Sequence, residues 1–287
     1  MSPTSTSKNA SFVVTAPFRT VCDHFARLFQ KHEMLRLYAV GTRNPTPGIS
    51  PELTRLLPLF GLLSYAAAKT LSGFRAESFR FGLHPMLDHW VKRKLKPGDN
   101  ILSSYGYANE SFKWVKRNGG RTFLDGGNSH PENFWQIIAE EHRRWNCPYP
   151  PIALHHYERA KAMMENVDYV FAPSSFVANS FLERGFSPDR VLRNIYPINL
   201  TCFSPRTTPR PKDQPLRIIN TGGVTLRKGT PYLLEAFRII LKSEPTARLM
   251  LTNTVADSMK PVLARYSDLP IDWSPGLPHA KLAERLR

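Results

Sequence analysis

The chain has 287 residues, of which 41% are hydrophobic, and a formal net charge of +16. This length and composition are those of a globular protein with a sizeable core, and they exclude a disordered chain. Three cysteines, at positions 22, 147 and 202, are too few and too widely spaced for a disulfide framework or a thiolate metal site.

The basic excess makes acidic partners candidates: nucleic acid, anionic lipid or a phosphorylated substrate. The first ten residues lack the apolar core of a signal peptide, so we expect a cytoplasmic protein. The apolar stretch 56–69 is interrupted by Pro58 and Gly61 and is too short to span a membrane. We expect it to be a buried helix, and peripheral contact with an anionic membrane is the alternative.

Short β-branched or aromatic runs alternate with helical patterns along most of the chain. This alternation predicts an α/β protein with a parallel sheet, because parallel strands need crossover helices. We expect strands at 11–14, 35–40, 100–105, 121–124, 168–172 and 190–196, and helices near 18–31, 84–95, 109–117, 131–145, 151–165 and 175–184.

A proline-rich segment without hydrophobic periodicity, residues 197–215, is interpreted as a linker. The expected domains are therefore 1–196 and 216–287. A new strand–turn–helix unit begins directly after the linker, with a strand at 216–220, a helix from about 230, and a returning strand at 247–253.

The turn in this unit, "NTGGVTLRKGTP" (220–231), contains Gly222 and Gly223, which let a ligand approach main-chain N–H groups closely. Thr230 is the expected N-cap, followed by a proline at the first helical position. A glycine turn that leads into a helix N-terminus favours an anion, and Arg227 and Lys228 would add cationic donors. The alternative is a plain turn with solvated basic residues.

Two well-known phosphate motifs are absent from the sequence. It contains no G-x-G-x-x-G followed by an acidic residue about 20 positions later, and no G-x-x-x-x-G-K-[ST]. A nucleotide diphosphate bound without either motif indicates nucleotide-sugar chemistry.

Three passages resemble retaining glycosyltransferases of family 4, which have two Rossmann-like domains (the GT-B fold). They are "NTGGVTLRKGTPYLLEAFRIILKSEPTARLML", "VDYVFAPSSFVANSFLERGFSPDRV" and "YPINLTCFSP", together covering about residues 167–255. The segment "FLDGGNSHPENFWQIIAEEHRRW" (123–145) is similar to one subgroup with less specificity.

The resemblance implies transfer of a sugar from a nucleotide-diphosphate donor to an acceptor, a glycan or a lipid-linked molecule, without a metal or another cofactor. Lys228 matches the family lysine that holds the departing diphosphate, and Arg227 would substitute for an arginine that the family often has where this chain has Gly223. The family's catalytic-loop histidine would fall near Asp125, and His130 is the other candidate for that role. For each of these two residues, a loop hydrogen bond is the alternative.

Near the C-terminus, the sequence departs from the pattern of this family. The family's next elements carry two glutamates eight positions apart that hold the donor sugar and ribose, and no such pair follows Lys228. About 70 residues follow the linker, half of a typical small α/β domain. We therefore expect a complete N-terminal Rossmann-like domain and a truncated C-terminal one, with strand 216–220 at an open sheet edge.

Two functions remain open from the sequence. One is a glycosyltransferase whose activity is impaired by truncation, and the other is a catalytically silent remnant that acts as a binding or scaffold protein. A nucleic-acid binder is disfavoured, because no recognisable module or aromatic-interleaved basic face accompanies the charge.

Overall fold

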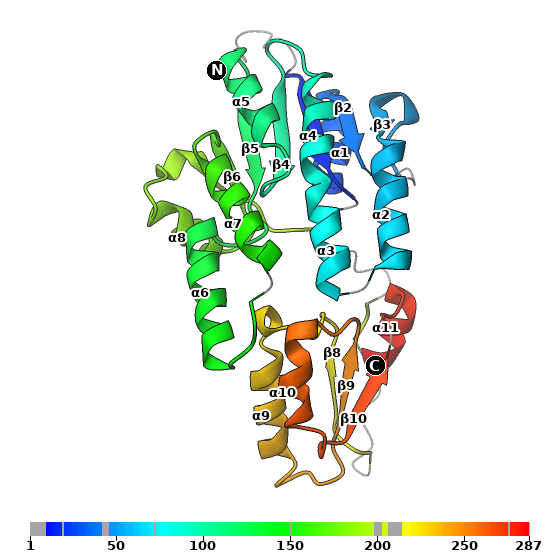
Figure 1. The fold of residues 1–287 in the computed structure, drawn as a ribbon. Helices are drawn as coiled ribbons and strands as arrows, with labels where there is room; N and C mark the ends of the chain where they lie inside the picture. Colours follow the sequence, from blue (N-terminus) through cyan, green and yellow to red (C-terminus); the bar gives the residue numbers. More distant parts are fainter. Residues whose placement is uncertain are drawn as a thin grey trace, which may run out of the picture. The chain divides into compact units, whose positions relative to one another are not determined.

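The structure is a computed structural model that describes residues 10–18, 20–41, 46–71, 73–149, 151–197, 203–205, 214–274 and 276–286. The chain divides into two compact units: unit 1 comprises residues 1–135 and 151–197, and unit 2 comprises residues 136–150 and 198–287. Each unit is an α/β structure with a parallel sheet (Figure 1). Most of the expected linker, residues 198–202 and 206–213, lies outside the described residues.

Unit 1 is built on a seven-stranded sheet in the order β3-β2-β1-β4-β5-β6-β7, and each neighbouring pair is parallel. The predicted parallel α/β fold is thus confirmed. The three-residue edge strand β3 was not predicted, and β7 is shorter than expected. The strands are β1 (Phe12–Ala16), β2 (Leu35–Val40), β3 (Thr54–Leu56), β4 (Asn100–Ser104), β5 (Thr122–Asp125), β6 (Tyr169–Ala172) and β7 (Val191–Arg193).

Helices connect successive strands of unit 1 and pack against both faces of its sheet. The helices are α1 (Cys22–Lys31), α2 (Pro58–Thr70), α3 (Gly73–Gly82), α4 (His84–Lys92), α5 (Asn109–Arg117), α7 (Pro151–Met164) and α8 (Ser175–Leu182), with 3-10 turns η1 (Pro51–Leu53) and η2 (Pro188–Arg190). The division between the two units falls within α6 (Pro131–Arg144).

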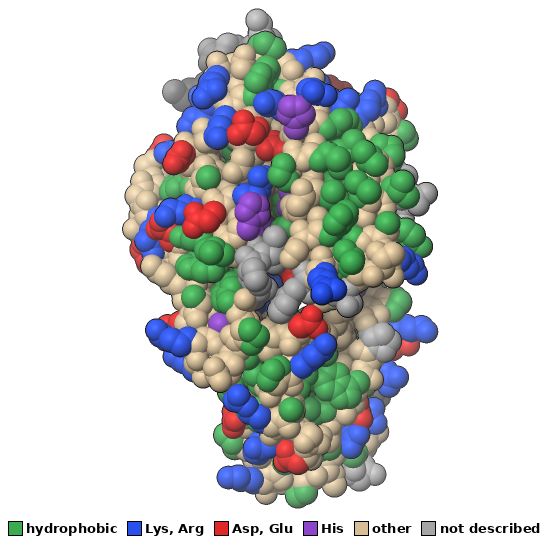
Figure 2. Space-filling view, viewed as in Figure 1, with side chains coloured by type: hydrophobic (Ala, Val, Ile, Leu, Met, Phe, Trp, Pro, Cys, Tyr) green, Lys and Arg blue, Asp and Glu red, His purple; other side chains and the backbone are tan. Residues whose placement is uncertain are grey.

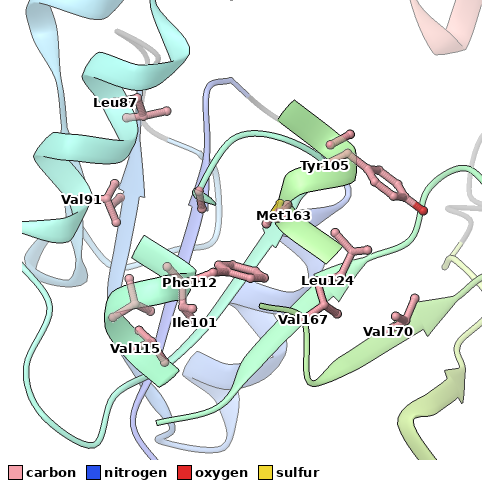
Figure 3. Packing of buried hydrophobic residues seen from close by; sticks show 14 of the residues in the cluster. Leu87, Val91, Ile101, Tyr105, Phe112, Val115, Leu124, Met163, Val167 and Val170 are labelled. Atoms are coloured by element: carbon pink, nitrogen blue, oxygen red, sulfur yellow. The ribbon is translucent and has the colours of Figure 1, made fainter. Parts of the chain in front are cut away.

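Strand alternation divides the core of unit 1 into two hydrophobic clusters, because successive side chains point to opposite faces. In β1, Val13 belongs to one cluster, whereas Phe12 and Val14 belong to the other. The second cluster is covered by α1, through Phe25 and Phe29 among others. The first cluster is covered by α4, α5, α7 and α8, and Figure 3 shows part of it: Leu87, Val91, Ile101, Tyr105, Phe112, Val115, Leu124, Met163, Val167 and Val170.

The apolar stretch 56–69 forms most of α2, and it is only partly buried. Phe60 and Ala67 are covered, and Phe60 packs so closely on Gly41 that a Cβ there would lie 2.3 Å from its ring. Leu59 and Leu62 are each 53% exposed, and Tyr65 is 55% exposed. The expectation that the whole stretch is buried is therefore wrong.

Unit 2 contains a three-stranded parallel sheet in the order β10-β9-β8, so β8 forms one edge of the described sheet. Its core includes Leu234 and Phe237 of α9 against Leu249 and Leu251 of β9, and Cys147 joins this core from the segment 136–150. The elements of unit 2 are β8 (Arg217–Asn220), η3 (Leu226–Lys228), α9 (Thr230–Ile240), β9 (Arg248–Thr252), η4 (Asp257–Met259), α10 (Lys260–Ala264), β10 (Ile271–Ser274) and α11 (His279–Leu286).

Candidate functional site

In unit 1, the strand order reverses between β1 and β4, and ligands of open α/β sheets bind outside the carboxyl ends of strands at such a switch point. Three polar side chains meet there: Cys22 at the start of α1, Ser104 at the end of β4, and Asp125 at the end of β5. Neither Ser104 nor Cys22 was predicted as a site residue, because no local motif marks them.

Asp125 is only 3% exposed, and its carboxylate is enclosed by donors. The Tyr196 hydroxyl donates to Oδ1 over 2.7 Å, and the Ser104 hydroxyl donates to Oδ2 over 3.1 Å. The Cys22 thiol lies 3.8 Å from the same Oδ2. Asp125 thus anchors the segment after β7 to the centre of the sheet, and its catalytic role stays a prediction.

Burial sets the electrostatics of this cluster. It raises the pKa of the Asp125 carboxyl, an effect that the hydrogen bonds from Tyr196 and Ser104 oppose. Burial, reinforced by the charge of Asp125, raises the pKa of the Cys22 thiol to about 12 and also raises the pKa of Tyr196. Cys22 is therefore a protonated thiol at neutral pH, which makes it a poor nucleophile.

His130 is 7% exposed, and its packed side chain lies directly before the first residue of α6. Its Nδ1 accepts a hydrogen bond from the Glu132 N–H (3.3 Å), and its own backbone N–H donates to the Ser180 hydroxyl (2.9 Å). The ring packs edge-on against Phe181 and Phe186, and burial lowers the pKa of the imidazole. These contacts are those of a neutral helix-capping histidine, and among the described residues no hydrogen bond joins it to Asp125.

The loop between Asp125 and His130 is fixed by its neighbours. Gly126 donates its N–H to the Phe171 carbonyl (2.9 Å), and a Cβ at Gly126 would lie 2.8 Å from that oxygen. The Tyr105 hydroxyl donates to the Asn128 carbonyl (2.6 Å). Gly127 and Asn128 are the exposed residues of this loop, so a ligand at this edge would meet them before Asp125.

In unit 2, the predicted glycine turn follows β8, and much of its hydrogen bonding is internal. The Gly222 N–H donates to Asn220 Oδ1 (2.8 Å), and the Val224 N–H donates to the Thr254 carbonyl (2.9 Å). The Thr225 hydroxyl accepts from the Lys228 N–H (3.1 Å) and thereby caps η3. These amides are therefore already bonded without an anion.

The start of α9 differs from the prediction by one residue. The N-cap is Gly229, whose φ of +67° is in the left-handed region that favours glycine, and Thr230 is the first helical residue. The Thr230 hydroxyl is buried and accepts from the Thr225 N–H (3.2 Å). The Thr230 hydroxyl thus bonds the glycine turn to the first residue of α9 and does not cap the helix.

Lys228 lies across the glycine turn. Its Cδ and Cε are 3.6 Å from the position that a Cβ on Gly222 would occupy, so the side chain crosses Gly222 at the carboxyl end of β8. Lys228 and Arg227 are both exposed, and neither forms an ion pair with another residue that the structure describes. The structure thus brings Lys228 together with Gly222, while Gly223 lies near Thr225 and Thr254.

No group of three histidine, cysteine or acidic side chains is arranged to hold a metal ion in the described part of the chain. Within the same residues, no helix is long and apolar enough to cross a membrane.

No protein-family model matches the sequence, and no curated protein matches it either. Solved structures do match, and they are GT-B proteins with two Rossmann-like domains, so the fold of this chain is GT-B-like.

Three of these structures illustrate the match. The lipopolysaccharide outer core galactosyltransferase WaaB is 14% identical at a TM-score of 0.51, over 97% of this chain and 71% of that one. MnaA of S. aureus with UDP is 10% identical at a TM-score of 0.50, over 96% and 71%. A trehalose-6-phosphate structure from E. coli bound with UDP-2-fluoro glucose is 11% identical at a TM-score of 0.50, over 96% of this chain and 76% of that one. At these identities the similarity shows the fold alone.

Proposed function

We propose that unit 2 binds a nucleotide-diphosphate sugar, with the Lys228 ammonium on the diphosphate. The observation that carries this proposal is the Lys228 side chain lying across Gly222 at the carboxyl end of β8, exposed and without an ion-pair partner among the described residues. An ammonium beside a glycine turn binds phosphate as a point charge. The GT-B-like fold supports the proposal, since two of the similar structures were solved with UDP or a UDP-sugar analogue.

The proposed reaction is transfer of the sugar to a glycan or lipid-linked acceptor, as the resemblance to retaining family 4 glycosyltransferases implies. The bond between the anomeric carbon and the diphosphate breaks, and its electron pair leaves with the diphosphate. The anomeric carbon bonds to the oxygen of an acceptor hydroxyl, and the proton of that hydroxyl passes to an oxygen of the departing diphosphate. Lys228 would stabilise the charge that develops on the leaving diphosphate, a role that needs no metal.

Binding and turnover test this proposal separately. Calorimetric titration with UDP, GDP and ADP measures binding, and release of nucleoside diphosphate from the corresponding sugar donors measures turnover. We expect Lys228→Gln to weaken binding by about 10- to 100-fold, the effect of one charge-assisted hydrogen bond. Lys242→Gln, an exposed lysine beyond the other end of α9, is the matched control and should bind like the wild type. Failure of the wild type to bind any of the three nucleotides would overturn the proposal.

A second candidate function is binding without turnover. It is favoured by Asp125 and His130, which are both buried and hydrogen-bonded within unit 1 and so are poorly placed to exchange protons with a substrate. Nucleotide binding with no diphosphate release from any donor, in the presence of glycan and lipid-linked acceptors, would support this second function over the first.

A further inference from the structure

Helix α2 lies at the surface of unit 1 although its sequence is apolar around its whole circumference. Its 13 residues, PLFGLLSYAAAKT, contain one charged side chain, Lys69. Helices that are apolar all round are normally enclosed by protein or lipid. Here Phe60 and Ala67 cover the core, while Leu59, Leu62 and Tyr65 are each more than half exposed. The exposed apolar surface therefore needs an explanation beyond the packing of unit 1.

The exposed residues form one continuous face of the helix. Pro58, Leu62, Tyr65 and Lys69 follow one another at spacings of three or four, so they lie on one side, and Leu59 and Ala66 widen the same side. We call these six residues the α2 face. Figure 2 shows hydrophobic side chains gathered over α2 and α3, and Phe79 of α3 is a further exposed aromatic residue, at 42%. Contiguous exposed patches of this kind mark interaction sites.

Basic residues outnumber acidic residues in α2 and α3, and one of them, Lys69, is part of the α2 face. Residues 58–82 contain three basic residues, Lys69, Arg75 and Arg80, which are all exposed, and one acidic residue, Glu77, which is half-buried. The Lys69 ammonium lies 5.8 Å from the centre of the Tyr65 ring. A lysine that extends along an aromatic side chain at the end of an apolar face can place its charge among lipid headgroups while its stem stays in apolar surroundings.

We propose that the α2 face docks on the surface of an anionic lipid bilayer. Leu59, Leu62 and Tyr65 would enter the boundary between headgroups and acyl chains, with Lys69 among the lipid phosphates, and the exposed Arg75 and Arg80 of α3 would add long-range attraction to the anionic surface. The charge selects this partner: a net charge of +2 in residues 58–82, in a chain of +16, complements an anionic surface. The contact is peripheral, and it does not depend on the proposed nucleotide-sugar site.

Co-sedimentation of the full chain with vesicles tests this proposal. We expect binding to vesicles of phosphatidylcholine with 30% phosphatidylserine at low salt, and weaker binding to pure phosphatidylcholine or at high salt. Replacing Leu59, Leu62 and Tyr65 together by serine should lower the partition coefficient at least tenfold. Replacing Lys69, Arg75 and Arg80 by glutamine should lower it about a hundredfold on anionic vesicles, from about fivefold per charge.

A matched control removes equally exposed apolar side chains elsewhere in unit 1: Leu28→Ser, Leu154→Ser and Phe176→Ser, from residues that are 50%, 50% and 62% exposed. This variant should bind vesicles like the wild type, and circular dichroism checks that all variants are folded. Absence of binding to anionic vesicles at low salt would overturn the proposal. So would equal loss in the control, or a wild-type dimer that the serine variant of the α2 face converts to a monomer, since the face would then join two copies.

Discussion

Asp125 is a carboxylate whose surroundings decide its chemistry. It lies at the switch point of the sheet of unit 1, where a ligand-facing acid would be expected, yet it is 3% exposed and bonded to Tyr196 and Ser104. Burial penalises its charged form, while the two hydroxyl donors favour it, and the balance leaves its pKa raised. The hydrogen bond from Tyr196 thus ties the segment after β7 to Asp125, while burial makes ionisation of the carboxyl unfavourable.

The raised pKa has a consequence for stability. Because the folded state binds the Asp125 proton more tightly than the unfolded state, its contribution to stability is complete at low pH and is lost as pH rises from about 4 through the folded-state pKa. Asp125→Asn removes this titration. We therefore expect the free energy of unfolding of the wild type, measured relative to the variant by urea denaturation, to fall as pH increases over this range. A difference that stays constant or rises with pH would contradict this prediction.

Among the elements, the loop after β5 depends on a glycine. A Cβ at Gly126 would lie 2.8 Å from the Phe171 carbonyl and 3.0 Å from Val170 Cγ1 in the neighbouring strand. Gly126→Ala would force these strands apart, and we expect a loss of about 2 kcal/mol in the free energy of unfolding. Gly82→Ala is the control, because a Cβ there meets nothing within 4 Å, and thermal or urea unfolding compares the two. Equal stability of the two variants would refute the prediction.

The segment 136–150 is the second element with a testable role. Within unit 2, the Trp145 ring packs edge-on against Tyr232, whose hydroxyl bonds to Glu141 (2.7 Å), and Cys147 is part of the core. Trp145→Ala should therefore lower the stability of unit 2 by roughly 2 kcal/mol, less than the 3–5 kcal/mol typical of a fully buried aromatic residue. Trp273→Ala, at a side chain that is 53% exposed, should cost less than 1 kcal/mol. If Trp273→Ala lowers the free energy of unfolding as much as Trp145→Ala does, the packing of Trp145 on Tyr232 does not stabilise unit 2 as predicted.

These elements also show what the sequence could predict. Hydrophobic periodicity predicts most of the strands and helices of unit 1 and the strand–turn–helix–strand at the start of unit 2, because each of these elements repeats a local pattern. It does not predict β3, which has three residues, or the packing of 136–150 against α9, which depends on tertiary contacts. The pairing of Lys228 with Gly222 was predictable because the two lie six positions apart in one turn. The bond between Tyr196 and Asp125 joins residues 71 positions apart, and no local pattern encodes it.

At the scale of the whole molecule, the fold is GT-B-like, with a parallel α/β sheet in each of two units. The carboxyl ends of the strands carry a closed polar cluster in unit 1 and an exposed lysine over a glycine turn in unit 2. Lys228 is exposed and can reach an anionic ligand, whereas the carboxylate of Asp125 is already hydrogen-bonded to Tyr196 and Ser104. The chain's central function is therefore inferred from the turn in unit 2.

The most direct test of this account compares a nucleoside diphosphate with its monophosphate on two proteins. Calorimetric titration of the wild type with UDP and UMP, and with the guanosine and adenosine pairs, measures the preference for the second phosphate. We predict that for one of these pairs the wild type binds the diphosphate at least tenfold more tightly, and that Lys228→Gln abolishes this preference. A wild type that binds no diphosphate, or a preference that survives in Lys228→Gln, would contradict the account.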